Sequence, residues 1–227
     1  MSEVPATTPP VEEVAAPPDP EFEILGAEPV LYSAAPMVNF AAHVTEPEGR
    51  EVYTIALKAQ IMMEPAKRAY DADTKKRLIE LFGSPDRWAT TTQPFLLAEV
   101  DLLVPAFTGA TAFRIPLTAS YDLELSAAKY IYSLPDGHVP LSFNFTGTIF
   151  YRAGDGRMQI VQVPWDCSAQ FSLPVSVWRE TITHHYPEGG WLALGTQTLD
   201  ALSARKVALG LPTFDATIAA LLEGEEG

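Results

Sequence analysis

The side chains best suited to bind a metal or to act as nucleophiles are four histidines and one cysteine. His184 and His185 are adjacent, so on a helix their side chains would diverge by about 100°. Two zinc ligands on one helix are instead four residues apart, and a zinc site needs three or four protein ligands. No such cluster is present in the sequence, which therefore predicts no metal and no cofactor.

Cys167 follows Asp166 in an expected strand and is typical of a small buried side chain. A catalytic cysteine needs a neighbouring histidine and a lowered pKa. Acidic pairs such as Glu99 and Asp101 share a strand face and could act as a general acid and base. Such pairs also arise on any strand face that is exposed to solvent. No Gly-x-Ser-x-Gly motif or phosphate-binding loop occurs. The sequence thus predicts no catalytic residue and favours a binding protein over an enzyme.

Basic residues are concentrated in one stretch, where 21 positions hold six of the fifteen lysines and arginines. We predict that this stretch and the tryptophan after it form a partner-binding surface. The predicted residues are Lys67, Arg68, Lys75, Lys76, Arg77, Arg87 and Trp88. Arginine and tryptophan are enriched in interface hot spots. Two other interpretations stay open: a solvated helix with internal ion pairs, or an Arg87–Trp88 anchor that holds a helix on the sheet.

The formal net charge of −14 disfavours nucleic acid and anionic membranes as partners. No apolar run reaches the roughly 18 residues of a membrane helix. The first basic residue is Arg50, so the start of the chain lacks the basic residues with which a signal peptide begins. With one cysteine, the chain forms no internal disulfide. The sequence therefore predicts a cytoplasmic protein.

Alternating apolar and polar residues predict strands that have one buried face. The expected strands are 38–44, 52–64, 95–104, 113–125, 141–151, 158–164 and 167–173. Pro116 cannot donate a backbone hydrogen bond, so it indicates a sheet edge or a bulge. The short turn Ala153-Gly154-Asp155-Gly156 favours antiparallel neighbours.

Helical periodicity predicts one internal helix, at 74–82 with Asp73 as its cap, and further helices near the end. These are 174–185, 197–209 with Thr196 as its cap, and 213–223. The expected fold class is α+β: an antiparallel sheet of about seven strands, one internal helix and two to three C-terminal helices.

Residues 1–20 contain six prolines and four acidic residues but few large apolar side chains. This composition predicts a disordered tail whose removal leaves folding intact. The remainder, residues 21–227, is expected to be a single α+β domain.

Several stretches resemble an uncharacterised bacterial family, a domain of unknown function. They include Gln60–Pro65, Leu81-Phe82-Gly83, Arg87-Trp88, Ala127–Tyr130, Leu173-Pro174-Val175 and Gly210–Thr213. Genes of that family often lie near those of nickel–iron hydrogenases. The resemblance implies an accessory protein that acts through protein–protein contacts, with a hydrogenase-related partner. The alternative is a small-molecule-binding protein or an enzyme that uses a pocket in the sheet.

Overall fold

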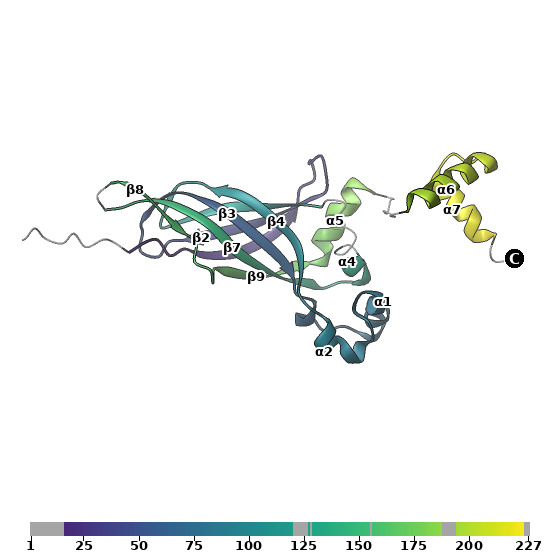
Figure 1. Cartoon of the computed structure of the whole chain (residues 1–227), viewed down its shortest axis with the longest axis horizontal. Coiled ribbons are helices and arrows are strands. Elements are labelled where there is room, and N and C mark those ends of the chain that lie inside the picture. The colour runs from purple at the N-terminus through teal and green to yellow at the C-terminus, as the bar shows by residue number, and fades with distance from the viewer. Residues whose placement is uncertain (1–15, 120–126, 128, 155, 188–193, 225–227) are drawn as a thin grey trace, which may run out of the picture. The chain divides into compact units, whose positions relative to one another are not determined.

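The computed structural model describes residues 16–119, 127, 129–154, 156–187 and 194–224 (Figure 1). They fall into two compact units that divide after Pro187. The first unit, which we call the body, contains all the strands. The second, which we call the helix pair, comprises residues 194–224.

The strands of the body form two antiparallel sheets. One sheet has the order β1-β2-β6, with β1 at Glu21–Pro29, β2 at Met37–Thr45 and β6 at Ala110–Thr118. The other contains β3 (Glu51–Met63), β4 (Phe95–Val104), β5 (Phe107–Thr108), β7 (His138–Arg152), β8 (Met158–Gln162) and β9 (Ser168–Pro174). Its order is β4-β3-β7-β8, with β5 also beside β3 and β9 also beside β7.

The two sheets enclose one apolar core. Phe40 of β2 meets Phe143 of β7 edge-on, with ring centroids 5.1 Å apart, and Phe22 of β1 stacks on Phe145 at 4.4 Å. The sheet edges also adjoin, because β1 lies against β9, and β6 lies against β4 and β5. The two sheets therefore nearly close around the core. The strand β8 takes no part in these edge contacts and lies at one end of the body (Figure 1).

Four α-helices and two short 3-10 turns belong to the described part of the body. They are η1 (Pro65–Lys67), α1 (Ala72–Phe82), η2 (Pro85–Arg87), α2 (Trp88–Thr91), α4 (Lys129–Ser133) and α5 (Val175–His185). The side chain of Asp71, rather than the predicted Asp73, caps α1 by accepting from the Thr74 N–H. Asp71 precedes the first helical residue, which is the position where a carboxylate can reach the free N–H groups.

The helix pair consists of α6 (Thr196–Leu209) and α7 (Phe214–Glu223). The predicted cap of α6, Thr196, is instead its first helical residue, and Gly195 holds the cap position without a side-chain hydrogen bond. Thr213 does cap α7, because its hydroxyl accepts from the Ala216 N–H at 3.1 Å. Gly210 ends α6 with a left-handed φ of 65°, a conformation that glycine adopts without strain.

The α+β class and the antiparallel pairing are confirmed. The details differ, since the structure has two sheets of three and six strands and six α-helices among its described residues. Pro116 lies in β6, at an edge of the three-stranded sheet, as predicted. The strand expected at 113–125 is seen to Thr118, and 120–126 lie outside the described residues.

Most of the predicted tail, residues 1–15, also lies outside the described residues. Of residues 16–20, Pro18 and Pro20 are buried, and the Pro17 carbonyl accepts from Arg50 Nη1 at 3.0 Å. Packing of the body therefore begins before β1. No helix in the described part of the chain is long and apolar enough to cross a membrane.

Candidate binding surfaces

Most of the predicted basic residues lie on the surface around α1. Lys75, Lys76, Arg77 and Arg87 are exposed. The Lys76 ammonium lies 3.0 Å from Asp73, and Arg77 donates to the Thr74 hydroxyl at 3.4 Å. These contacts within one helix resemble ordinary surface pairs, which contribute only a few tenths of a kcal/mol. Partner binding at these positions stays a prediction.

Lys67 is the last residue of η1, and its side chain bridges two elements. Its ammonium donates to Gln170 Oε1 of β9 at 3.1 Å and lies 3.4 Å from Glu64 Oε1. Half of the Lys67 side chain is still exposed. It therefore remains available to a partner.

Arg68 makes its contacts inside the body. Its guanidinium donates to the carbonyls of Asp136 at 2.7 Å and His138 at 2.5 Å. It lies directly against Gly137, whose φ of 80° suits a glycine. Arg68 thus holds the turn that leads into β7.

Trp88 is buried in the body rather than exposed on the predicted binding surface. Its indole N–H donates to the Gly83 carbonyl at 2.9 Å, and its ring meets Tyr70 and Phe82 edge-on. Such contacts anchor the end of α1 against the body, which is the competing interpretation offered by the sequence. No partner is needed to explain the position of Trp88.

Cys167 and His185 are held by contacts within the body. Burial raises the pKa of the Cys167 thiol to about 11, and the thiol donates to the Pro20 carbonyl at 3.4 Å. Cys167 is therefore a protonated, weakly nucleophilic group at neutral pH. The His185 ring lies 3.0 Å from the Thr181 carbonyl and 3.1 Å from the Ser33 carbonyl, so it links α5 to the β1–β2 turn.

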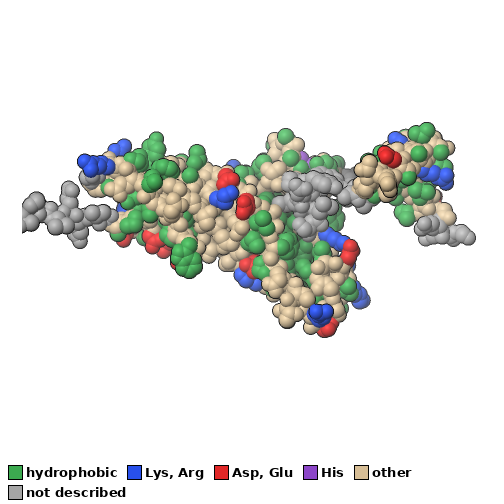
Figure 2. Space-filling model, in the orientation of Figure 1, with side chains coloured by type: hydrophobic (Ala, Val, Ile, Leu, Met, Phe, Trp, Pro, Cys, Tyr) green, Lys and Arg blue, Asp and Glu red, His purple; other side chains and the backbone are tan. Residues whose placement is uncertain are grey.

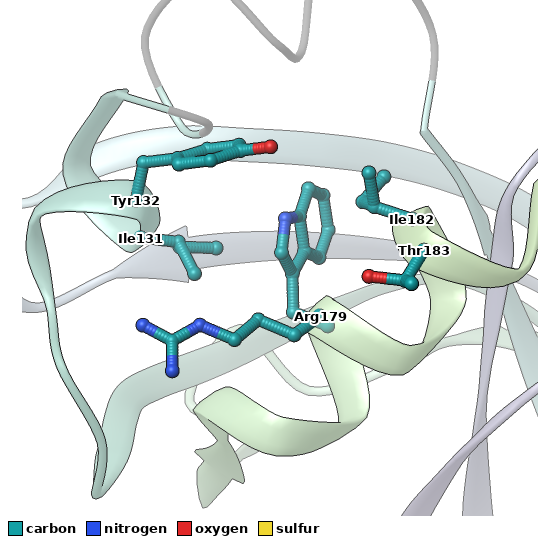
Figure 3. Close-up of a pocket in the computed structure, with 6 residues that line it drawn as sticks. Ile131, Tyr132, Arg179, Ile182 and Thr183 are labelled. Carbon is teal, nitrogen blue, oxygen red and sulfur yellow. The ribbon is translucent and has the colours of Figure 1, made fainter. Parts of the chain in front are cut away.

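A cavity of about 160 Å³ lies between α4 and α5 (Figure 3). Ile131 and Tyr132 approach it from α4, facing Arg179, Ile182 and Thr183 of α5. The Arg179 guanidinium donates to the carbonyls of Leu134 and Pro135, which ties the two elements together. The sequence did not indicate this cavity, because its walls come from segments about 50 residues apart.

Trp178 also lines this cavity and carries a buried polar atom, its indole nitrogen. The residue is 2% exposed, and its indole N–H makes no hydrogen bond with any residue that the structure describes. An unsatisfied buried donor destabilises a protein by about 1–3 kcal/mol. A bound group that accepts this hydrogen bond would recover that free energy.

The outer face of the six-stranded sheet is hollowed at Gly147 by an open groove of about 480 Å³. Leu103 of β4, 72% exposed, forms one wall, and the Lys58 ammonium lies 3.1 Å from Asp101 beside it. Figure 2 views this face and shows hydrophobic side chains toward the β8 end, with Lys and Arg side chains at its tip. Met158 and Ile160 of β8 are 47% and 65% exposed.

The helix pair exposes its large apolar side chains. Those most exposed are Leu199, Val207, Leu209, Phe214, Leu221 and Leu222. Across residues 194–224, all of which the structure describes, Thr217 is the one buried residue. Taken by itself, the helix pair has helices but no apolar core.

Comparison with known proteins gives a family without an assigned activity. A model described as a family of unknown function matches residues 17–227. The match therefore spans both the body and the helix pair. No curated protein matches the chain.

Proposed function

Because the chain belongs to that family of unknown function, DUF6084, we propose its role from geometry: it is a binding protein that works through contacts with another protein. One observation carries the proposal. Taken by itself, the helix pair is a folded element whose large apolar side chains are all exposed or only partly covered. Such side chains call for a second surface to cover them.

The energetics of the helix pair support this role. Isolated helices shorter than about 12–15 residues are marginal in water, and α6 and α7 have 14 and 10 residues. Full burial of a valine or leucine contributes about 1.5–3 kcal/mol. Covering Val207, 77% exposed, and Leu222, 62% exposed, would therefore stabilise the pair substantially.

The expected partner surface is an apolar groove. Residues 194–224 carry three acidic and two basic side chains, so this element is nearly neutral in a chain of net charge −14. Long-range charge thus contributes little to docking here, and helix-in-groove packing supplies the affinity. A hydrogenase-related partner stays a prediction, because the family match carries no link to hydrogenase genes.

Capture and rebinding test this proposal. Tagged full-length protein should recover a partner from native cells, and the purified partner should rebind. The double variant Val207→Glu/Leu222→Glu should bind that partner at least tenfold more weakly, a loss of about 1.4 kcal/mol. Gln197→Glu, at an exposed polar position of α6, serves as the control and should bind normally. Equal affinity of all variants, or no partner that rebinds, would refute the proposal.

The cavity between α4 and α5 supports a second candidate function, the binding of a small molecule. Its walls are largely apolar, and the Trp178 N–H is one donor that has no partner among the described residues. Small-molecule sites combine such apolar walls with a few polar groups that fix orientation. The fitting ligand is a small planar apolar molecule with one acceptor oxygen.

Acetophenone and ethylbenzene form a matched pair of probes, since only the first carries an acceptor. We expect the folded protein to bind acetophenone about tenfold more tightly by NMR titration. Trp178→Phe should remove that preference, and Trp165→Phe, which changes a 92% exposed indole, should keep it. Absence of binding, or a preference that survives Trp178→Phe, would exclude this candidate.

A further inference from the structure

The strand β8 is an open edge of the six-stranded sheet. It pairs with β7 alone among the described strands, from Gln162 opposite Thr148 to Met158 opposite Arg152. Its sequence, Met-Gln-Ile-Val-Gln, contains no proline and no charged residue. Isoleucine and valine at its centre favour extended backbone.

The direction of the backbone groups in β8 follows from two hydrogen bonds. The Val163 N–H donates to the Gly147 carbonyl, and the Ala153 N–H donates to the Arg157 carbonyl, both at 2.9 Å. The odd-numbered residues of β8 therefore direct their backbone N–H and C=O groups toward β7. In an antiparallel ladder the alternate residues direct theirs the other way. The N–H and C=O groups of Met158, Ile160 and Gln162 thus point to the open side.

The other long edges of the body carry the features that normally block pairing with another chain. The edge strand β1 has a bulge between Ile24 and Gly26, and β6 contains Pro116. The edge strand β4 carries Glu99 and Asp101. Of the described edge strands longer than two residues, β8 stands apart in having neither charge, proline nor bulge.

We propose that β8 pairs antiparallel with β8 of a second copy, around a twofold axis at Ile160. Ile160 of each copy then lies opposite Ile160 of the other, and Met158 opposite Gln162. In this register the three residues that point to the open side all find backbone partners. The two six-stranded sheets join into one, and the interface is isologous, as in most homodimers.

Charge favours this place for contact between copies. Each chain has a formal net charge of −14, so two copies repel one another over most of their surface. The strand β8 adds no charge to the contact, and Arg152 of β7, which lies opposite Met158, has its guanidinium 3.6 Å from Glu51. Met158 and Ile160 would also lose exposed apolar area on pairing.

Sedimentation equilibrium of the full chain tests the inference, and we expect a concentration-dependent dimer. Ile160→Lys should weaken dimerisation at least tenfold, because two ammonium groups would then face each other. Ile160→Pro should do the same, because it removes an N–H that points to the open side while keeping the bonds to β7. Leu103→Lys, at an exposed apolar position of the same sheet, is the control and should dimerise normally.

The helix-pair variant separates this inference from the proposed function. Val207→Glu/Leu222→Glu should dimerise normally even where it loses its other partner. A monomer at all concentrations, including one whose β8 pairs with a segment of another protein, would overturn the inference. A dimer that persists in both Ile160 variants would overturn it too. Hydrogen exchange should show the amides of Met158, Ile160 and Gln162 protected in the dimer and exchanging freely in Ile160→Lys.

Discussion

Gly147→Ala is expected to destabilise the body by about 3 kcal/mol or more. Gly147 has a φ of 145°, and a Cβ atom there would lie 2.1 Å from the Ala56 carbonyl oxygen of the neighbouring strand β3. Backbone strain of this kind costs about 1–3 kcal/mol, and forced overpacking adds about 1–3 kcal/mol. Urea unfolding of the purified variant measures the loss. The affected pair, β3 and β7, is the centre of the six-stranded sheet.

Gly26→Ala is the matched control, because Gly26 also lies in a strand. A Cβ atom at Gly26 would meet nothing within 4 Å, and its φ is not in the left-handed region. We expect its free energy of unfolding to change by less than about 1 kcal/mol. Two variants of similar stability would show that the close approach at Gly147 relaxes freely.

Arg50→Ala is expected to destabilise the body by about 3 kcal/mol. Glu46 is buried, and its carboxylate accepts from Arg50 Nη1 at 3.0 Å and from the Arg50 backbone N–H at 2.6 Å. Removal of the guanidinium would leave a buried carboxylate without its counter-charge, which is strongly destabilising. The same change removes the hydrogen bond from Arg50 to the Pro17 carbonyl.

Two further variants check that explanation. Glu46→Gln in the Arg50→Ala background removes the stranded charge, so the double variant should be more stable than Arg50→Ala alone. Arg152→Ala breaks a pair with Glu51 whose side chains are both more than half exposed, and it should cost less than about 1 kcal/mol. Purely additive losses at Glu46 and Arg50 would contradict the buried-pair account.

The sequence predicts strands well where one face of the sheet is buried and the other is not. Ile55, Leu57 and Ile61 alternate with polar residues in β3 and are buried as expected. The strand β1 escapes this rule. Its bulge after Ile24 interrupts the period of two, and Leu25 is exposed although apolar. Local pattern does not reveal such a strand, because its pairing with β2 determines which side chains are buried.

The candidate sites were harder to predict, because residue type does not distinguish a side chain that holds the fold together from one that binds a partner. Arginine and tryptophan are typical of interfaces, yet Arg68 and Trp88 bind groups within the body. The partners of Arg68 lie about 70 residues away in the chain, so only the fold brings them together. For the same reason, no local pattern indicates that Trp178 lines a cavity.

The helix pair shows the opposite limit of sequence analysis. In α7, Phe214, Leu221 and Leu222 recur at helical spacing, which is typical of a face that packs against a core. Both helices form as predicted, but neither helix covers these residues within the helix pair. Amphipathic spacing identifies a face that needs covering. It contains no information on which surface covers it.

The pairing of β3 with β7 has a kinetic consequence. Leu57 lies opposite Gly147, 90 residues later in the chain. The ribosome must therefore release residues up to the end of β7 before β3 can acquire its second neighbour. Folding dominated by such distant pairings is slow, because loop closure comes before most of the favourable contacts. Until then, the edge of β3 that later pairs with β7 has no partner strand. An unpaired edge of this kind makes a nascent sheet prone to aggregation.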